Sequence, residues 1–238
     1  TKPDCAVVCF PGGGSRRWQL PYRGSIRNYI EGTGAELWIP LYPLLPDYDL
    51  MDETEFTIRL HEKMLKRFPA ENIVWLGISG GADVLMQAGR HMVKKYPELP
   101  MPGLMLPVSV SGLLMSEDAK TRMRGIDSRD PILHWDMFET MVKYYNPNGD
   151  LPQYILGKAD EDDYTGFPKI IMYFGGDEVF AGIAPDYEKS FIRCGVKDYE
   201  IKIKEGMPHA YPMFTFLKEG REGEREIIAD INRYFESC

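Results

Sequence analysis

Short apolar runs alternate along the chain with longer stretches of helical spacing. The longer stretches, such as 82–93 and 227–235, repeat apolar residues every third or fourth position, which is typical of helices that pack one face on a sheet. The short runs indicate strands buried on both faces at 6–10, 36–41, 73–76, 103–111 and 169–174, and an edge strand at 199–204. This alternation predicts an α/β fold, with a mainly parallel sheet of about six strands and helices on both faces.

The stretch at about 113–150 departs from this pattern. Residues 115–129 are charged and show neither helical nor alternating periodicity, so we expect an irregular segment there. A short amphipathic helix follows and carries Trp135, Phe138 and Met141. In a doubly wound fold such an insertion lies above the strand ends. We therefore expect a small cap-like insertion whose three side chains either line a substrate pocket or make ordinary core contacts.

Composition and charge narrow the range of partners. The 238 residues carry a formal charge of −8 and no long run of lysine or arginine, so neither nucleic acid nor a membrane surface is an expected partner. No apolar stretch approaches the roughly 18–20 residues that span a bilayer, and the first five residues do not form a signal peptide. Four cysteines are too few for a disulfide scaffold, so we expect reduced thiols and a cytoplasmic protein.

The strongest chemical signal is the segment Gly77-Ile78-Ser79-Gly80-Gly81, which follows a predicted strand and precedes a predicted helix. A serine at a tight strand-to-helix turn is held in a strained backbone conformation with its hydroxyl exposed, and the flanking glycines leave room for neighbouring backbone. This pattern predicts the nucleophile elbow of a serine hydrolase. The alternative is a glycine-rich turn of structural use only.

A second glycine-rich turn, Pro11-Gly12-Gly13-Gly14-Ser15, comes directly after the first predicted strand. Glycines add no side chains to a core and cost backbone entropy, so their use should be exposed backbone N–H groups. An acyl-transfer enzyme needs such donors near its serine, to hold the negative oxygen of the tetrahedral intermediate. The alternative is a flexible loop.

Two further candidates also follow predicted strands. All loops that follow the strands of a parallel sheet emerge at one edge, so Ser79, Asp177 and His209 should converge there. Ser79 would attack an acyl carbonyl, His209 would take its proton, and Asp177 would orient the imidazole and stabilise its charged form. We prefer Asp177 to its neighbour Glu178 because it comes directly after the glycines at the strand end. The alternative for Asp177 is a carboxylate that bonds its own turn.

Together these motifs resemble the α/β-hydrolase superfamily and, within it, the hormone-sensitive-lipase-like esterases. The resemblance covers nearly the whole chain and implies a single α/β-hydrolase domain over residues 1–238, hydrolysis of short-acyl carboxylic esters and no cofactor. The family's His-Gly-Gly-Gly, Gly-Asp-Ser-Ala-Gly and Tyr-Arg-Leu-Ala-Pro motifs are similar to residues 11–14, 77–81 and 42–46. Three more segments follow in the family's order and at about its spacing, namely Asp130-Pro131, 175–178 and 206–209.

The resemblance also implies that the backbone N–H groups of Gly12, Gly13 and Gly80 form an oxyanion hole. The sequence departs from the family's motifs at two positions, because Pro11 replaces a histidine and Ile78 replaces an acidic residue. The family's first two strands and N-terminal cap helices have no counterpart in this sequence. We therefore expect a pocket that is more open than usual or that another chain completes.

The leading hypothesis is a serine carboxylesterase acting on small esters, acetylated sugars among them. A triad does not choose between ester and amide, so a peptidase or amidase is the nearest rival, and a non-catalytic ligand-binding homologue is the rival from another class. No metal site is expected, because the sequence has no His-x-x-x-His or Cys-x-x-Cys pair and residues 160–163 indicate a solvated acidic loop. The edge strand near 199–204 makes a homodimer an expectation.

Overall fold

Six parallel strands form the centre of the molecule. The computed structural model describes residues 2–20 and 23–237. The strands lie in the order β2-β1-β3-β4-β5-β6, and all neighbouring pairs are parallel. Their bounds are β1 (Ala6–Phe10), β2 (Glu36–Trp38), β3 (Ile73–Ile78), β4 (Leu104–Val108), β5 (Lys169–Gly175) and β6 (Tyr199–Lys204). The predicted architecture of the sheet is confirmed.

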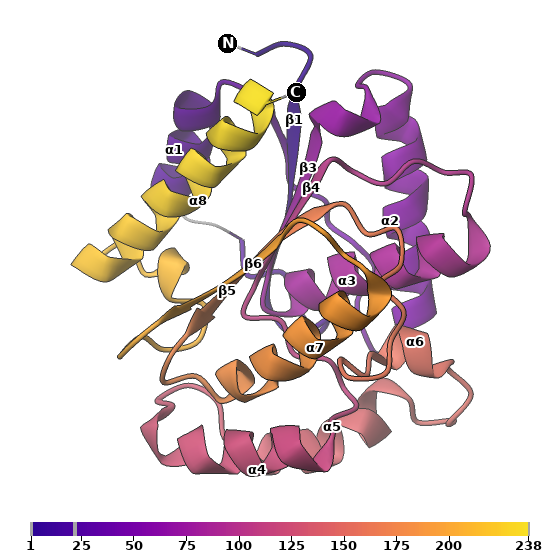
Figure 1. Ribbon diagram of the computed structural model, residues 1–238, viewed down its shortest axis with the longest axis vertical. Coiled ribbons are helices and arrows are strands. Elements are labelled where there is room, and N and C mark those ends of the chain that lie inside the picture. The colour runs from indigo at the N-terminus through magenta and orange to yellow at the C-terminus, as the bar shows by residue number, and fades with distance from the viewer. Residues whose placement is uncertain (1, 21–22, 238) are drawn as a thin grey trace.

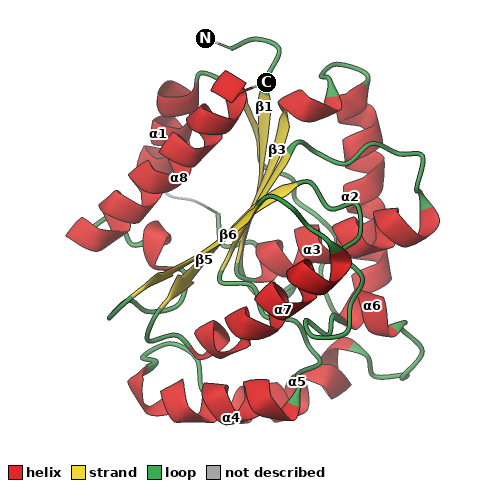
Figure 2. Ribbon diagram, in the orientation of Figure 1, coloured by secondary structure: helices red, strands yellow, loops and turns green. Residues whose placement is uncertain are grey.

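Helices cover both faces of this sheet. Figure 1 shows α1 and α8 on one face, α2, α3 and α7 on the other, and α4 and α5 together at the bottom of the view. Figure 2 shows the strands as one layer between the two sets of helices. Among the described residues, no helix has the length and apolarity needed to cross a membrane. The helices are α1 (Arg23–Thr33), α2 (Leu50–Leu65), α3 (Gly80–Lys95), α4 (Glu117–Ile126), α5 (Asp136–Tyr145), α6 (Gln153–Leu156), α7 (Ala184–Cys194) and α8 (Lys218–Ser237), with short 3-10 turns η1 (Ala70–Asn72), η2 (Asp127–Arg129), η3 (Val179–Ile183) and η4 (Tyr211–Met213).

Successive strand residues point to opposite faces of the sheet, and both faces are buried. Val8 and Trp75 belong to the core shared with α2, α3 and α7, whereas Val7 and Leu76 belong to the core shared with α1 and α8. This two-sided burial explains why the sequences of β1, β3 and β4 are continuously apolar rather than alternating. Because all strands run the same way, the loops after β1, β3, β5 and β6 meet at one edge of the sheet.

Two expectations about polar segments are wrong. Residues 115–129 are not irregular, because they contain α4, whose N-cap Ser116 accepts a hydrogen bond from the Ala119 N–H at 3.0 Å. Only Ala119 and Met123 of this helix are buried, so its apolar stripe is too narrow to give a helical period. The acidic segment 160–163 is not fully solvated either. Asp162 is buried and pairs with Arg90 of α3 at 3.3 Å.

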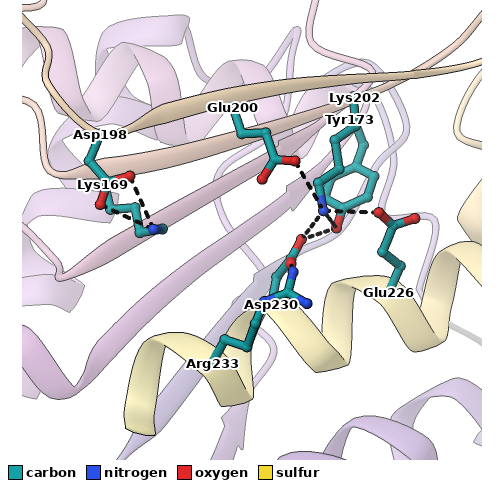
Figure 3. Close-up of polar contacts among 8 residues, drawn as sticks. All are labelled: Lys169, Tyr173, Asp198, Glu200, Lys202, Glu226, Asp230 and Arg233. Carbon is teal, nitrogen blue, oxygen red and sulfur yellow. Dashed lines mark hydrogen bonds and ion pairs between the residues drawn. The ribbon is translucent and has the colours of Figure 1, made fainter. Parts of the chain in front are cut away.

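An ionic cluster fastens α8 to the sheet. Figure 3 shows Lys202 of β6 reaching toward Asp230 and Glu226 of α8. Tyr173 of β5 donates its hydroxyl to the same Asp230, whose side chain is fully buried. Three carboxylates surround the Lys202 Nζ, at 2.7 Å (Asp230), 2.9 Å (Glu226) and 3.7 Å (Glu200). The cluster therefore fixes α8, and the start of that helix packs against the segment at 211–214.

Candidate active site

Ser79 lies at the sharp turn between β3 and α3. Its backbone φ of 53° and ψ of −124° belong to a conformation that side-chain-bearing residues rarely adopt. The Ser79 N–H donates to the carbonyl of Val108 on β4 at 2.8 Å, which ties the turn to the sheet. A β-carbon on Gly77 would lie 2.4 Å from the carbonyl oxygen of Gly81, so the turn closes this tightly only with glycine at that position. The serine thus stands at the tip of a strand-turn-helix elbow.

His209 follows β6 and reaches the serine. Its Nε2 lies 2.8 Å from the Ser79 Oγ, and the residue is only 7% exposed. The next residue, Ala210, has a positive φ of 54° and donates its N–H to the Ser109 hydroxyl at 2.9 Å. The Phe180 ring meets the imidazole edge-on, with ring centroids 5.2 Å apart. These contacts hold the imidazole toward Ser79.

The carboxylate beside His209 belongs to Glu178, which corrects the preference for Asp177. The Glu178 Oε2 lies 2.8 Å from the His209 Nδ1, and Glu178 is fully buried. The Asp177 carboxylate is instead 3.6 Å from the Arg129 guanidinium, and its side chain is 28% exposed. The Asp177 N–H donates to the Met207 carbonyl, so at position 177 the chain still runs beside the loop that follows β6. The next side chain, Glu178, is the one that points toward His209.

Two neighbours hold Glu178 in place. The Gly175 N–H donates to the Glu178 Oε1 at 3.0 Å. Asp130 accepts from the N–H of Val179 at 2.7 Å and from the N–H groups of Ile132 and Leu133, shortly before α5. Asp130 therefore ties the loop that carries the acid to the segment before α5. Burial raises the pKa of Glu178, and the hydrogen bonds that its oxygens accept oppose this shift.

Hydrogen bonds from different parts of the chain anchor the glycine loop that follows β1. These bonds run from the Tyr42 hydroxyl to the Pro11 carbonyl at 2.6 Å, from the Tyr145 hydroxyl to the Gly14 carbonyl at 2.5 Å, and from the Ser15 hydroxyl to the Glu53 carboxylate at 2.9 Å. Glu53 is fully buried on α2, and this burial raises its pKa well above the usual range. Its role was not apparent from the sequence, where it is one acidic residue in the first turn of a helix.

The anchored loop lies against the elbow at backbone distance. A β-carbon on Gly12 would lie 3.3 Å from the Ser79 Cβ, and one on Gly80 would lie 2.7 Å from the Gly14 nitrogen. Glycine at both positions therefore allows the loop backbone to approach the serine. Gly13 has a φ of 120°, which glycine adopts without strain. Of the three glycines predicted to supply N–H groups, Gly12 lies against Ser79, Gly80 follows Ser79 in the chain, and Gly13 follows Gly12.

A cavity of about 840 Å³ opens over Ser79 and His209. Phe138 and Met141 of α5 line it, but the structure does not place Trp135 on its wall. The Trp135 ring is buried and neighbours the Phe138 ring, with centroids 6.3 Å apart. Trp135, just before α5, belongs to the hydrophobic core. It shares the helical spacing of Phe138 and Met141, so the spacing alone did not distinguish a core residue from residues that line the cavity.

Another part of the cavity lining is polar and comes from α3. Asp83, Gln87 and Arg90 line it at helical spacing, on a helix whose other buried residues are mostly apolar. The Asp83 carboxylate accepts two hydrogen bonds from Ser111 and one from the Gly112 N–H, at 2.8 to 3.1 Å. Burial raises the pKa of Asp83. The sequence analysis did not identify this polar lining, although polar residues at 83, 87 and 90 have the spacing of one helix face.

The arrangement has a defined chemistry. With the proton of His209 on Nδ1, that N–H donates a hydrogen bond to the Glu178 carboxylate, and Nε2 is left free to take the proton of the Ser79 hydroxyl. A serine activated in this way can form a covalent bond to an acyl carbon. The described residues include no group of three or more histidine, cysteine, aspartate or glutamate side chains arranged to hold a metal ion.

Comparisons with known proteins agree with this fold. A family model described as alpha/beta hydrolase fold matches residues 12–213. Similar solved structures include an esterase/lipase from an uncultured bacterium (18% identity, 98% of this chain and 78% of that chain, TM-score 0.82), the HSL homologue EstE7 from a metagenome library (21%, 98%, 80%, 0.82) and an esterase from the bacterial hormone-sensitive lipase family (19%, 98%, 77%, 0.80). The comparison with curated proteins gives no match. The resemblance inferred from the motifs is confirmed at the level of the fold.

Proposed function

This chain belongs to the family with the alpha/beta hydrolase fold, and we propose that it is a serine carboxylesterase that hydrolyses small esters with short acyl chains. One observation carries the proposal, namely the hydrogen-bonded chain from Glu178 through His209 to Ser79, with both contacts at 2.8 Å. The similar structures named above are esterases or lipases, which supports carboxylic esters as the substrate class.

The reaction proceeds in two halves. The Ser79 Oγ attacks the ester carbonyl carbon while the His209 Nε2 takes the hydroxyl proton. The backbone N–H groups of Gly12, Gly13 and Gly80 hold the negative oxygen of the tetrahedral intermediate. The bond to the alcohol oxygen then breaks, His209 gives its proton to that oxygen, and the acyl group stays on the serine. Water attacks this acyl-enzyme with His209 as the base, which releases the carboxylic acid and restores the Ser79 hydroxyl.

Acetylated sugars are a subclass of these substrates. An acetyl group meets the short-acyl requirement, and the hydroxyl groups of a sugar need polar partners when they leave water. The cavity lining offers such partners on α3, in addition to the apolar residues of α5. A peptidase or amidase would use the same three residues. Turnover of a matched acetamide faster than the corresponding acetate would favour that rival.

A burst experiment with p-nitrophenyl acetate and butyrate tests the proposal. The native chain should release a rapid burst of p-nitrophenol followed by slower turnover, because acyl-enzyme accumulates. Intact-mass analysis after treatment with a fluorophosphonate should show one adduct on the native chain and none on Ser79→Ala. A folded native chain with neither turnover nor adduct would refute the hydrolase and support the ligand-binding alternative.

The free edge of β6 makes a homodimer part of the proposal. In the described sheet β6 pairs only with β5, and Ile203 on this edge strand is 47% exposed. An unpaired edge with an exposed apolar residue is a template for pairing with a second copy. Light scattering tests this, and a monomer at micromolar concentration would remove it. The cytoplasmic location stays a prediction from the sequence.

A further inference from the structure

Two consecutive arginines line the cavity beside the glycine loop. Arg16 and Arg17 are exposed, and both belong to the lining that includes Ser79 and His209. The central carbon of the Arg16 guanidinium lies 4.7 Å from the ring centroid of Tyr144, and Tyr144 of α5 also lines the cavity. A cation over a ring face is attracted to the ring without using its N–H donors. The ring therefore holds the Arg16 guanidinium at the cavity with donors left for a ligand.

Hydrogen bonds fix the backbone around these arginines. The Arg16 N–H donates to the Gly13 carbonyl at 3.3 Å, and the Gln19 N–H donates to the Gly12 carbonyl at 2.8 Å. A β-carbon on Gly13 would lie 3.0 Å from the Arg17 Cγ, so the stem of the Arg17 side chain begins directly beside that glycine. The glycine loop and the two cations are thus one short, hydrogen-bonded segment of the chain.

The charges of Arg16 and Arg17 are not matched within the described part of the chain. There, no carboxylate oxygen lies within 4.0 Å of either guanidinium. Exposed arginines elsewhere do find such partners, because Arg27 and Arg67 each pair with a glutamate, at 2.7 and 2.8 Å. The two arginines at the cavity are therefore free to bind an anion from solution.

The other residues of the lining that carry a formal charge have partners of their own. Asp83 accepts hydrogen bonds from Ser111 and from the Gly112 N–H, and burial raises its pKa, which favours the uncharged form. Arg90 pairs with the buried Asp162 at 3.3 Å. The cavity lining thus carries an excess of positive charge, although the whole chain has a formal charge of −8. A cleft with an excess of one sign attracts ligands of the opposite sign.

We propose that Arg16 and Arg17 form an anion-binding subsite and that the substrate is an ester which also carries a carboxylate. A guanidinium offers paired N–H donors that match the two oxygens of a carboxylate. The subsite would bind this group while Ser79 attacks the ester carbonyl. The inference rests on the proposed esterase function for its chemistry, but anion binding itself does not require turnover. It defines the substrates as half-esters of small dicarboxylic acids or acyl esters of small hydroxy acids.

Two matched pairs of esters test this inference by turnover. Monoethyl glutarate and ethyl 5-amino-5-oxopentanoate carry a carboxylate or a carboxamide on the acyl side, and 4-acetoxybutanoate and 4-acetoxybutanamide carry the same groups on the alcohol side. The carboxamide has nearly the same shape as the carboxylate without its charge. In at least one pair the native chain should have the higher kcat/KM for the carboxylate. This preference should shrink from about 20 mM to about 500 mM NaCl, because salt screens exposed charges.

Two double variants and one binding measurement complete the test. Arg16→Gln with Arg17→Gln should reduce the preference roughly threefold to tenfold, as expected for the loss of two exposed charge pairs. Arg27→Gln with Arg225→Gln removes the same charge from exposed residues of α1 and α8 that do not line the cavity, and should leave the ratio unchanged. Calorimetric titration of Ser79→Ala with the same pairs, with and without the changes at Arg16 and Arg17, measures the preference without turnover.

The outcomes separate the subsite from the esterase. If the native chain hydrolyses none of these esters, a binding preference that is lost without Arg16 and Arg17 would support the subsite and refute the esterase. Equal ratios in the native chain and in the folded variant of both arginines, while both hydrolyse the esters, would overturn the subsite alone. A native chain that prefers the carboxamide in both pairs would overturn it as well.

Discussion

Replacing Glu178 by glutamine should change which nitrogen of His209 carries the proton. One carboxylate oxygen accepts from the Gly175 N–H at 3.0 Å, and the other faces the His209 Nδ1 at 2.8 Å. Glutamine has a single side-chain oxygen, and the Gly175 N–H can bond only to that oxygen. The amide NH₂ must then face Nδ1, so Nδ1 becomes an acceptor and the proton moves to Nε2. An Nε2 that carries a proton cannot take the proton of Ser79.

The expected loss is large because Glu178 is fully buried and no water can replace it. Loss of the charge and the wrong tautomer together should lower kcat about 10³- to 10⁴-fold, which corresponds to roughly 4–5.5 kcal/mol of transition-state stabilisation. The assay is steady-state hydrolysis of p-nitrophenyl acetate. Circular dichroism and thermal unfolding establish that the variant is folded.

Asp177→Asn is the matched control. It makes the same chemical change one residue earlier, on a side chain that is 28% exposed and faces Arg129 at 3.6 Å. We expect kcat within about twofold of the native value, because an exposed ion pair contributes little. A folded Glu178→Gln variant with near-native kcat, or a larger loss in Asp177→Asn, would refute the assignment of the acid.

Three further predictions concern the surroundings of the site. Tyr145→Phe removes the hydrogen bond to the Gly14 carbonyl and should lower kcat/KM about fivefold, whereas Tyr48→Phe at an exposed site should not; equal kinetics in both would sink the anchoring role. Burial raises the pKa of Glu53, so the unfolded chain releases this proton at lower pH than the folded chain. The free energy of unfolding, measured by urea titration, should therefore fall as pH rises above the ordinary carboxyl range. Glu53→Gln should flatten this fall, and an unchanged dependence on pH in the variant would contradict the prediction. Lys202→Met leaves the buried Asp230 with Arg233 as its remaining cation among the described residues and should cost about 2 kcal/mol of stability, whereas Lys169→Met in the exposed pair with Asp198 should cost at most about 1 kcal/mol; similar midpoints of thermal unfolding would argue against the cluster.

The sheet could be predicted from the sequence because strands that are buried on both faces consist almost entirely of apolar residues. The strand at 73–78 is apolar throughout, and Ser79 follows it within a glycine pattern that only a sharp turn requires. His209 was identifiable because it follows the last strand, while the other three histidines fall in helical patterns or at the start of one. Position relative to a strand end was sufficient for these residues.

The acid could not be identified in this way, because two adjacent carboxylates share the same strand end. The choice depends on where the backbone turns inward, which the bonds of Asp177 and Gly175 decide in three dimensions. The buried groups of α2 and α3 were hidden for a related reason. Glu53 and Asp83 are ordinary polar residues in a helix pattern, and the structure buries Glu53 fully and Asp83 in part beneath the loops that bond to them.

Tyr145 has a consequence for how selectivity of this protein can be evolved in the laboratory. It stands on the same short helix as Phe138 and Met141, yet its hydroxyl holds the Gly14 carbonyl rather than facing only the substrate. A mutational library directed at α5 therefore moves the wall of the cavity and the glycine loop together, and gains in substrate range are linked to losses in rate. Gln87 of α3 lines the same cavity, and its Oε1 makes no hydrogen bond to the loop among the described residues. Diversifying α3 around Gln87 is the route that separates the two traits.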